Sequence, residues 1–100
     1  MQHLIIVKYS EAVTDREAFL REVGELFKGL TEIKGIRGVR LLPGKPLREN
    51  RYDLIIKISM EESALEAYDK SEIHRRWKSD YTKYVLKKAI FDCEDAEWIM

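Results

Sequence analysis

Cysteine, histidine and proline are scarce in this sequence. Its 100 residues include one cysteine, Cys93, two histidines, His3 and His74, and two prolines. A lone cysteine cannot form an internal disulfide bond, and the three potential zinc ligands lack the short spacing that zinc sites use. We therefore expect no disulfide framework and no metal site. The cysteine usage fits a reduced, cytoplasmic setting.

Long apolar runs, an excess of charge and a glycine-rich loop are also missing. The longest uninterrupted apolar run is Leu4–Val7, whereas a membrane helix needs about 20 apolar residues. Residues 1–4 contain no basic segment, so no secretory signal is expected. The 18 basic residues balance 18 acidic ones, which argues against generic binding to nucleic acid. Gly35 and Gly38 precede a predicted strand rather than a helix, so we expect no phosphate loop and no cofactor.

The sequence is as long as one domain, which we place at residues 1–100, and its apolar residues recur periodically. Hydrophobic residues make up 45% of the sequence, too many for a disordered chain. Residues 3–9 are almost wholly apolar and predict a central strand. Thr14 and Glu17 match a capping box. This box opens a predicted helix over residues 15–31, where apolar side chains recur at helical spacing.

Two strands are predicted next, joined by a polar hairpin loop at residues 43–51. Residues 39–42 form the first of them, and Pro43 and Gly44 end it. Residues 52–60 form the second, because apolar and polar side chains alternate along them.

Two helices and a strand complete the predicted order. Ser59 and Glu62 offer a second capping box, which opens a short helix with Leu65 and Tyr68 on its inner face. Ser71 can cap a further helix. Its apolar stripe runs at helical spacing through Ile73, Trp77, Tyr81, Tyr84, Val85 and Ala89. Residues 91–99 predict an edge strand.

This order of elements, β-α-β-β-α-β with the second helical unit split in two, is the ferredoxin-like α+β arrangement. Its four antiparallel strands carry helices on one face only. The uncovered face would carry Leu4, Ile6 and Ile55, mixed with Lys8 and Lys57. Such a face is too apolar for open water and too polar for a core. It predicts a homodimer in which two sheets meet as a dimeric α+β barrel.

Five segments, in their order along the chain, resemble the stress-responsive α/β-barrel (Dabb) domain family. They are Gln2–Tyr9, Ile33–Ile36, Tyr52–Leu54, Leu65–Tyr68 and Ser71–His74. The resemblance spans nearly the whole chain and implies a ferredoxin-like monomer that dimerises through its sheet. Members of the family include boiling-stable plant stress proteins and a plant polyketide cyclase. The wider superfamily includes small cofactor-free oxygenases.

The resemblance also implies three site residues. Cyclase-type members use a histidine on the first strand, and a tyrosine and a histidine around the break in the second helical unit. Here His3, Tyr68 and His74 occupy those positions. The sequence departs from the family at Ser71 and Glu72, where many members have His-Pro. This departure weakens the transfer of the cyclisation reaction itself.

The chemistry of these side chains suits acid–base catalysis. Partial burial disfavours the cationic form of an imidazole, so His74 would be neutral at pH 7 and able to accept a proton. The hydroxyl of Tyr68 can donate to an enolate that develops when a proton next to a carbonyl is removed. His3, at one end of the same cavity, would assist. The alternative is a buried His–Tyr pair that only packs, with His3 exposed at a strand end.

Several aromatic residues leave two interpretations open. They are Tyr9, Phe19, Trp77, Tyr81 and Tyr84. These side chains can line an apolar ligand pocket or form the core. Buried tyrosine hydroxyls need hydrogen-bond partners, so several tyrosines on one helix favour a wet or ligand-binding cavity.

The distribution of charge says more than its total. Residues 34–51 carry six basic side chains and a single acid, whereas residues 92–97 carry four acids and no base. These segments flank the two edges of a ferredoxin-like sheet. We therefore expect the basic edge of one copy to meet the acidic edge of the other. The alternative is two solvated faces of a monomer.

The sequence thus predicts a protein that binds a small apolar ligand bearing a carbonyl group, with polyketide-cyclase-like acid–base catalysis by His74 as base, Tyr68 as donor and His3 as auxiliary. Two alternatives stay open: a non-enzymatic, stress-associated homodimer without a ligand, and a cofactor-independent, monooxygenase-like enzyme. The expected partners are a second copy and the ligand, with no nucleic acid and no membrane.

Overall fold

The computed structural model describes residues 1–96 and residue 99. Its strands are β1 (Gln2–Tyr9), β2 (Ile36–Pro43), β3 (Leu54–Met60) and β4 (Val85–Cys93). Its α-helices are α1 (Arg16–Phe27), α2 (Leu65–Asp69) and α3 (Glu72–Asp80). Short 3₁₀ turns follow α1 (Lys28–Glu32), precede α2 (Glu62–Ala64) and follow α3 (Thr82–Tyr84). Within the described residues, none of the helices is long and apolar enough to cross a membrane.

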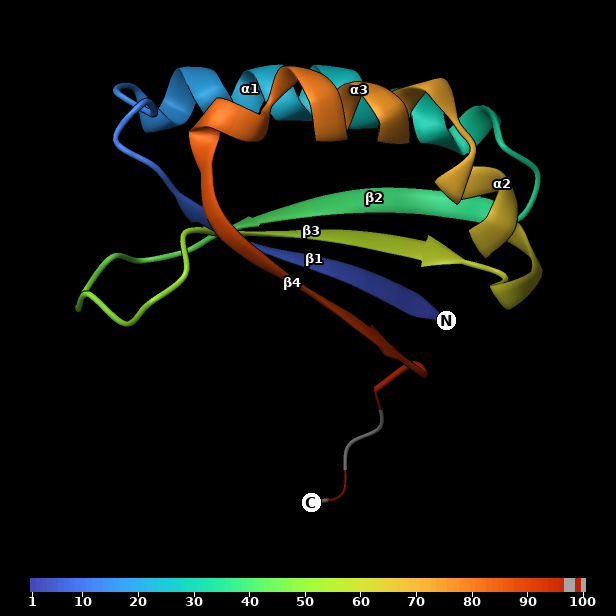
Figure 1. The fold of residues 1–100 in the computed structure, drawn as a ribbon. Coiled ribbons are helices and arrows are strands. Elements are labelled where there is room, and N and C mark those ends of the chain that lie inside the picture. The colour runs from blue at the N-terminus through green and yellow to red at the C-terminus, as the bar shows by residue number, and fades with distance from the viewer. Residues whose placement is uncertain (97–98, 100) are drawn as a thin grey trace.

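The strands form one antiparallel sheet in the order β2-β3-β1-β4. This topology confirms the ferredoxin-like prediction, with β1 in the middle and β2 and β4 at the edges. Helices α1 and α3 cover one face of the sheet, and α2 lies at one end of it (Figure 1). Among the described residues, no helix lies over the opposite face, and the chain leaves β4 on that side (Figure 1).

The core lies between the sheet and the helices. Along β3 every second residue is buried, as the alternation in the sequence predicts. β1 follows the same rule on the same face, because directly paired residues of neighbouring strands share a face. The strand side chains in the core are Ile5, Val7, Ile36, Leu54, Ile56, Ile58 and Met60. The helices and turns add Phe19, Val23, Leu26, Phe27, Leu30, Ala64, Tyr68, Trp77 and Tyr81.

The cap of helix α1 lies one residue later than predicted. The cap is Asp15, whose carboxylate accepts a hydrogen bond from the N–H of Ala18 at 3.0 Å. The prediction of Thr14 as the cap is wrong. Asp15 can satisfy the same free N–H groups, and its negative charge also suits the positive end of the helix dipole. The α-helix ends at Phe27, and the rest of the predicted helix winds into the 3₁₀ turn Lys28–Glu32.

One of the two other predicted caps is confirmed. The Ser71 hydroxyl accepts a hydrogen bond from the N–H of His74 at 3.1 Å and opens α3. The prediction of Ser59 as a cap is wrong, because this residue is still part of β3. Its hydroxyl accepts a hydrogen bond from the Gln2 amide across the sheet, at 3.2 Å.

The last helix ends earlier, and the last strand begins earlier, than predicted. α3 stops at Asp80 and β4 starts at Val85, so the helical stripe beyond Tyr81 and the strand over residues 91–99 are both wrong. The residues from Val85 onwards include the β-forming Val85, Ile90 and Phe91, and they pair with the whole length of β1. A longer helix would leave that edge of β1 without a partner. Trp98 lies outside the described residues.

The bare face of the sheet carries an apolar row that crosses all four strands, as predicted in part. Paired residues place Leu42 beside Ile55, Ile55 beside Ile6, and Ile6 beside Ala89. Phe91 extends the row along β4. Leu42 is 43% exposed and Phe91 is 56% exposed, so this row faces solvent in the isolated chain.

Candidate functional site

A cavity of about 260 Å³ lies between the helix-facing side of β1 and β4 and the helices α2 and α3. It exists because the helices do not cover β4: Ile90 points to the helix side and is still 53% exposed. The lining includes all three predicted site residues, His3, Tyr68 and His74. The structure thus brings the three residues to one cavity, and their role as a site stays a prediction.

Three different elements bring these side chains together. His3 lies on β1, on the buried face that it shares with Ile5. Tyr68 comes from α2, the short helix at the end of the sheet. His74 lies in the first turn of α3, where the Ser71 cap fixes the start of the helix. The break between α2 and α3 is what allows both helices to point into one cavity.

Tyr68 lies between the two imidazoles. Its ring centroid is 5.3 Å from that of His3, in an edge-on arrangement, and 4.7 Å from that of His74. These separations are those of direct ring contact. A small ligand that reaches the Tyr68 hydroxyl would therefore also be close to a histidine.

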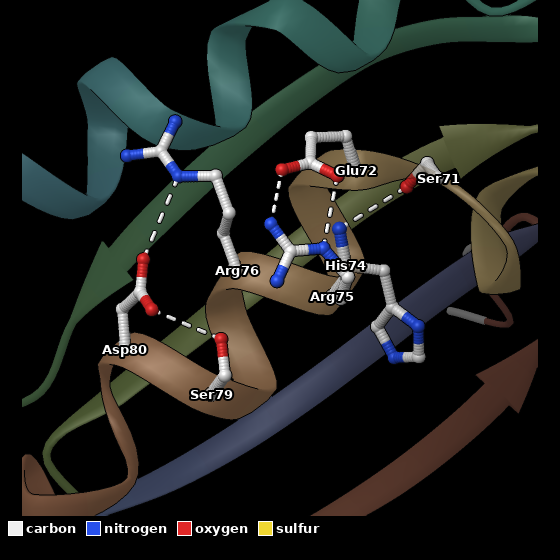
Figure 2. A network of polar contacts seen from close by, with 7 residues as sticks. All are labelled: Ser71, Glu72, His74, Arg75, Arg76, Ser79 and Asp80. Atoms are coloured by element: carbon white, nitrogen blue, oxygen red, sulfur yellow. Dashed lines mark hydrogen bonds and ion pairs between the residues drawn. The ribbon is translucent and has the colours of Figure 1, made fainter.

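The imidazole of His74 is held by the backbone of the preceding helix. Its Nδ1 lies 3.0 Å from the carbonyl oxygen of Asp69. Because a carbonyl oxygen only accepts, Nδ1 carries the hydrogen, and in the neutral ring Nε2 keeps the lone pair. Figure 2 shows this ring apart from the Glu72–Arg75 ion pair of the same helix. This contact fixes the orientation of the His74 ring and leaves Nε2 as its acceptor nitrogen.

The imidazole of His3 is held by a carboxylate. Its Nδ1 lies 2.5 Å from Oδ1 of Asp92, the residue directly opposite on β4. The side chain of His3 is 7% exposed and that of Asp92 is 42% exposed. The carboxylate accepts a hydrogen bond from Nδ1–H of His3 and so fixes the tautomer of the ring. Nε2 takes no part in this hydrogen bond. The alternative of an exposed histidine at a strand end is wrong.

The hydroxyl of Tyr68 is buried and finds no hydrogen-bond partner in the part of the chain that the structure describes. The residue is 1% exposed. Burial raises the pKa of Tyr68 well above its ordinary value, and the carboxylate of Asp69 raises it further. Tyr68 is therefore a neutral O–H donor without an acceptor. Such a group costs about 1–3 kcal/mol, so an acceptor atom in the cavity would be favourable.

Most of the aromatic residues whose place the sequence leaves open belong to the core. Phe19 contacts Tyr9 and Tyr84 with ring centroids 5.0 and 5.2 Å apart. Trp77 does both: it stacks on Tyr81 at 5.6 Å and also lines the cavity. Within the part of the chain that the structure describes, no group of three or more His, Cys, Asp or Glu side chains could hold a metal ion.

Sequence reasoning misses Asp69 of α2 and two polar lining residues of the last strand, Asp92 and Lys88. Asp92 and Lys88 lie on the helix-facing side of β4, opposite His3 and Val7. The signal that could reveal them is the pairing of β4 with β1, which places every second residue of β4 on the face of His3. A strand predicted to start at residue 91 hides this relation.

Comparison with known proteins gives matches in structure alone. No family model and no curated protein matches the chain. A Dabb family protein with a ferredoxin-like fold from Mesorhizobium loti superposes with a TM-score of 0.70 at 16% identity, over 96% of both chains. A dimeric protein of unknown function with a ferredoxin-like fold, from Bacteroides fragilis, gives 0.74 at 13% identity, over 94% of both chains.

An antibiotic biosynthesis monooxygenase-like protein from Bacteroides thetaiotaomicron gives a TM-score of 0.72 at 13% identity, over 100% of this chain and 92% of its own. At such low sequence identity the superposition shows that the fold is shared, and it says nothing about the ligand or the reaction. The chain therefore has the ferredoxin-like α+β fold, which it shares with a Dabb protein, with dimeric proteins of unknown function and with a monooxygenase-like protein.

Proposed function

We propose that this protein is a stress-responsive α/β-barrel (Dabb) domain, spanning residues 1–100, that binds a small carbonyl compound in the cavity between α2, α3 and the sheet. The observation that carries the proposal is Tyr68, whose buried hydroxyl has no partner among the described residues and whose ring contacts two oriented imidazoles. A ligand carbonyl oxygen would accept the hydrogen bond that the hydroxyl lacks. The apolar walls, among them Ile5, Ile90 and Trp77, would hold the rest of the ligand.

The same arrangement suits removal of a proton next to that carbonyl. Nε2 of His74 takes the proton, the electrons of the broken C–H bond move to the carbonyl oxygen, and the Tyr68 hydroxyl donates a hydrogen bond to the resulting enolate. His3, oriented by Asp92, is the auxiliary group. Acid–base catalysis of this kind contributes about 10²–10⁴-fold to a rate.

Exchange of enolisable protons tests this proposal directly. The probe is para-hydroxyacetophenone in heavy water, and the measurement is the loss of its methyl signal by proton NMR. We expect the protein to accelerate the exchange, and we expect His74→Gln and Tyr68→Phe each to reduce the acceleration at least tenfold. Tyr81→Phe is the matched control, because Tyr81 packs in the core and is not part of the cavity lining.

A different result would favour the non-enzymatic alternative. If the ketone neither exchanges faster nor shifts the NMR resonances of Tyr68 and His74, the catalytic proposal is wrong. The protein would then be a stress-associated homodimer whose cavity takes no ligand.

We further propose that the protein is a homodimer that pairs through the bare face of its sheet. The apolar row of Leu42, Ile55, Ile6 and Ala89 supports this assembly, because contiguous exposed apolar area is typical of an interface. Structural neighbours from Bacteroides fragilis and Thermobifida fusca are dimeric.

Charge on the same face supports this arrangement. A hollow of about 440 Å³ lies next to the apolar row and is lined in part by Arg37, Arg40 and Lys57. We propose that it meets acidic residues of the second copy from the segment after β4. Within its own chain, Asp95 accepts a hydrogen bond from Gln2 at 2.6 Å on this face, so this segment lies within reach of an interface.

A further inference from the structure

The candidate cavity has a cation at one end of its floor. Along β4, Lys88, Ile90 and Asp92 lie on the helix-facing side, opposite Val7, Ile5 and His3 in turn. All three line the cavity. Alternate residues of a strand are about 6.8 Å apart, so the floor runs from a cation through an apolar residue to the Asp92–His3 pair over about 13 Å of backbone.

The ammonium group of Lys88 is free to bind a ligand. Among residues 1–96 and 99, no ion pair or side-chain hydrogen bond engages it. Lys88 is exposed at the mouth of the cavity, so its charge loses little hydration before a ligand arrives. Asp92 differs, because its carboxylate already accepts from His3.

The two carboxylates of the lining lie at the other end. Asp69 follows Tyr68 directly in α2, and Asp92 is bound to His3. Both repel an anion from the hydroxyl of Tyr68. Carboxylates therefore lie near Tyr68 and a cation lies at the other end of the floor, an arrangement that favours one orientation of a ligand with an acid group.

We propose that Lys88 determines specificity by binding a carboxylate of the ligand, so that the ligand class is an apolar keto acid with its carbonyl group at Tyr68. This inference rests on the proposed function and adds the acid group and its place in the cavity. The apolar part of the ligand lies over Ile90 between the two polar ends. Lys88 is a binding residue and takes no part in moving the proton.

The experiment compares two probes of nearly the same shape, one anionic and one neutral. Para-acetylbenzoate carries a ketone and a carboxylate, and para-acetylbenzamide replaces the carboxylate by a neutral amide. Affinities are measured by NMR titration of the full chain. We expect the wild-type protein to bind the benzoate about fivefold more tightly, which is the size of a well-placed exposed ion pair. The preference should shrink as salt is added.

The variants are Lys88→Met and, as the matched control, Lys87→Met. Lys87 precedes Lys88 on β4 and pairs with Lys8 on the bare face. Lys88→Met should remove the preference for benzoate and leave the affinity for benzamide unchanged, while Lys87→Met should keep the preference. If both probes bind equally well to the wild type, or if Lys88→Met keeps the preference, the role of Lys88 is wrong and the cavity proposal stands. If neither probe binds, both proposals are wrong.

Discussion

The side chain of Tyr68 contributes to the free energy of unfolding with two opposite signs. Its ring is fully buried and packs against His3 and His74, and deletion of a buried aromatic ring typically costs about 3–5 kcal/mol. Its hydroxyl is desolvated without a partner, which costs about 1–3 kcal/mol. An unpartnered buried polar group, on a residue that lines a cavity, is typical of a binding site.

Tyr68→Phe separates these two contributions. The substitution keeps the ring and removes the unpartnered hydroxyl, so we expect the free energy of unfolding to rise by about 1 kcal/mol. Urea denaturation with an unchanged slope measures the difference. Tyr81→Phe is the control. In the wild type the Tyr81 hydroxyl lies 3.5 Å from a carboxylate oxygen of Glu22, so its removal should not raise the free energy of unfolding. A Tyr68→Phe protein less stable than the wild type would contradict the picture of an idle hydroxyl.

At the scale of elements, Asp53 connects β1, α1 and β3. It directly precedes β3. Its carboxylate accepts one hydrogen bond from the backbone N–H of Tyr9, at 2.8 Å, and another from the guanidinium group of Arg16, at 2.6 Å. Tyr9 ends β1 and Arg16 begins α1. Burial alone would raise the pKa of Asp53, but the Tyr9 amide and Arg16 together lower it below its ordinary value.

This pKa gives the contact a defined pH dependence. A carboxyl group whose pKa is lower in the folded state stabilises the fold above its unfolded pKa, about 3.9 for aspartate. The stabilisation is lost as the pH falls through the folded pKa. We expect Asp53→Asn to lower the free energy of unfolding by about 1–3 kcal/mol at pH 7. The difference from the wild type should shrink steadily below about pH 4.

Urea denaturation between pH 7 and pH 2 measures this difference. Glu72→Gln is the control, because Glu72 pairs with Arg75 while both side chains are largely exposed. Exposed ion pairs contribute little, so the control should follow the wild type closely. A deficit of Asp53→Asn that stays constant over the whole pH range would show that the charge of Asp53 is not what links the three elements.

The order of elements could be predicted from the sequence, and the boundaries near β4 could not. The alternation along β3 and the apolar run of β1 are local signals, and both strands form where expected. Tyr81, Tyr84 and Val85 fit one turn of helix, so spacing alone extends α3 too far. What ends the helix is a distant interaction, the pairing of β4 with the free edge of β1.

The same distinction applies to the candidate site. The resemblance to the Dabb family implies His3, Tyr68 and His74 as site residues, and the strand or helix face on which His3 and His74 lie points each of them toward the space between sheet and helices. Asp92 and Lys88 could not be placed there, because their place depends on which residues of β4 lie opposite β1. Side chains whose contacts are set by strand pairing are hidden from local patterns, whereas those set by a helix face or a cap are not.

At the scale of the whole molecule, the bare face of the sheet is the surface that calls for a packing partner. One face of the sheet packs against the helices, while the other exposes an apolar row next to Arg40 and Lys57. In a two-fold dimer this face would meet its own copy. Burial of the row would supply the hydrophobic part of the interface, and the acids that follow β4 would supply the charge.

Phe91→Glu is the test of this assembly. Phe91 lies on the bare face of β4 and is 56% exposed, and its neighbour Ile90 lies on the helix-facing side and is 53% exposed. A glutamate at position 91 would bury a charge in the interface, so we expect a monomer by size-exclusion chromatography with light scattering. Ile90→Glu places the same charge on the other face at equal exposure and should stay dimeric. A dimeric Phe91→Glu protein, or a wild type that is monomeric at low salt, would show that this face is not the interface.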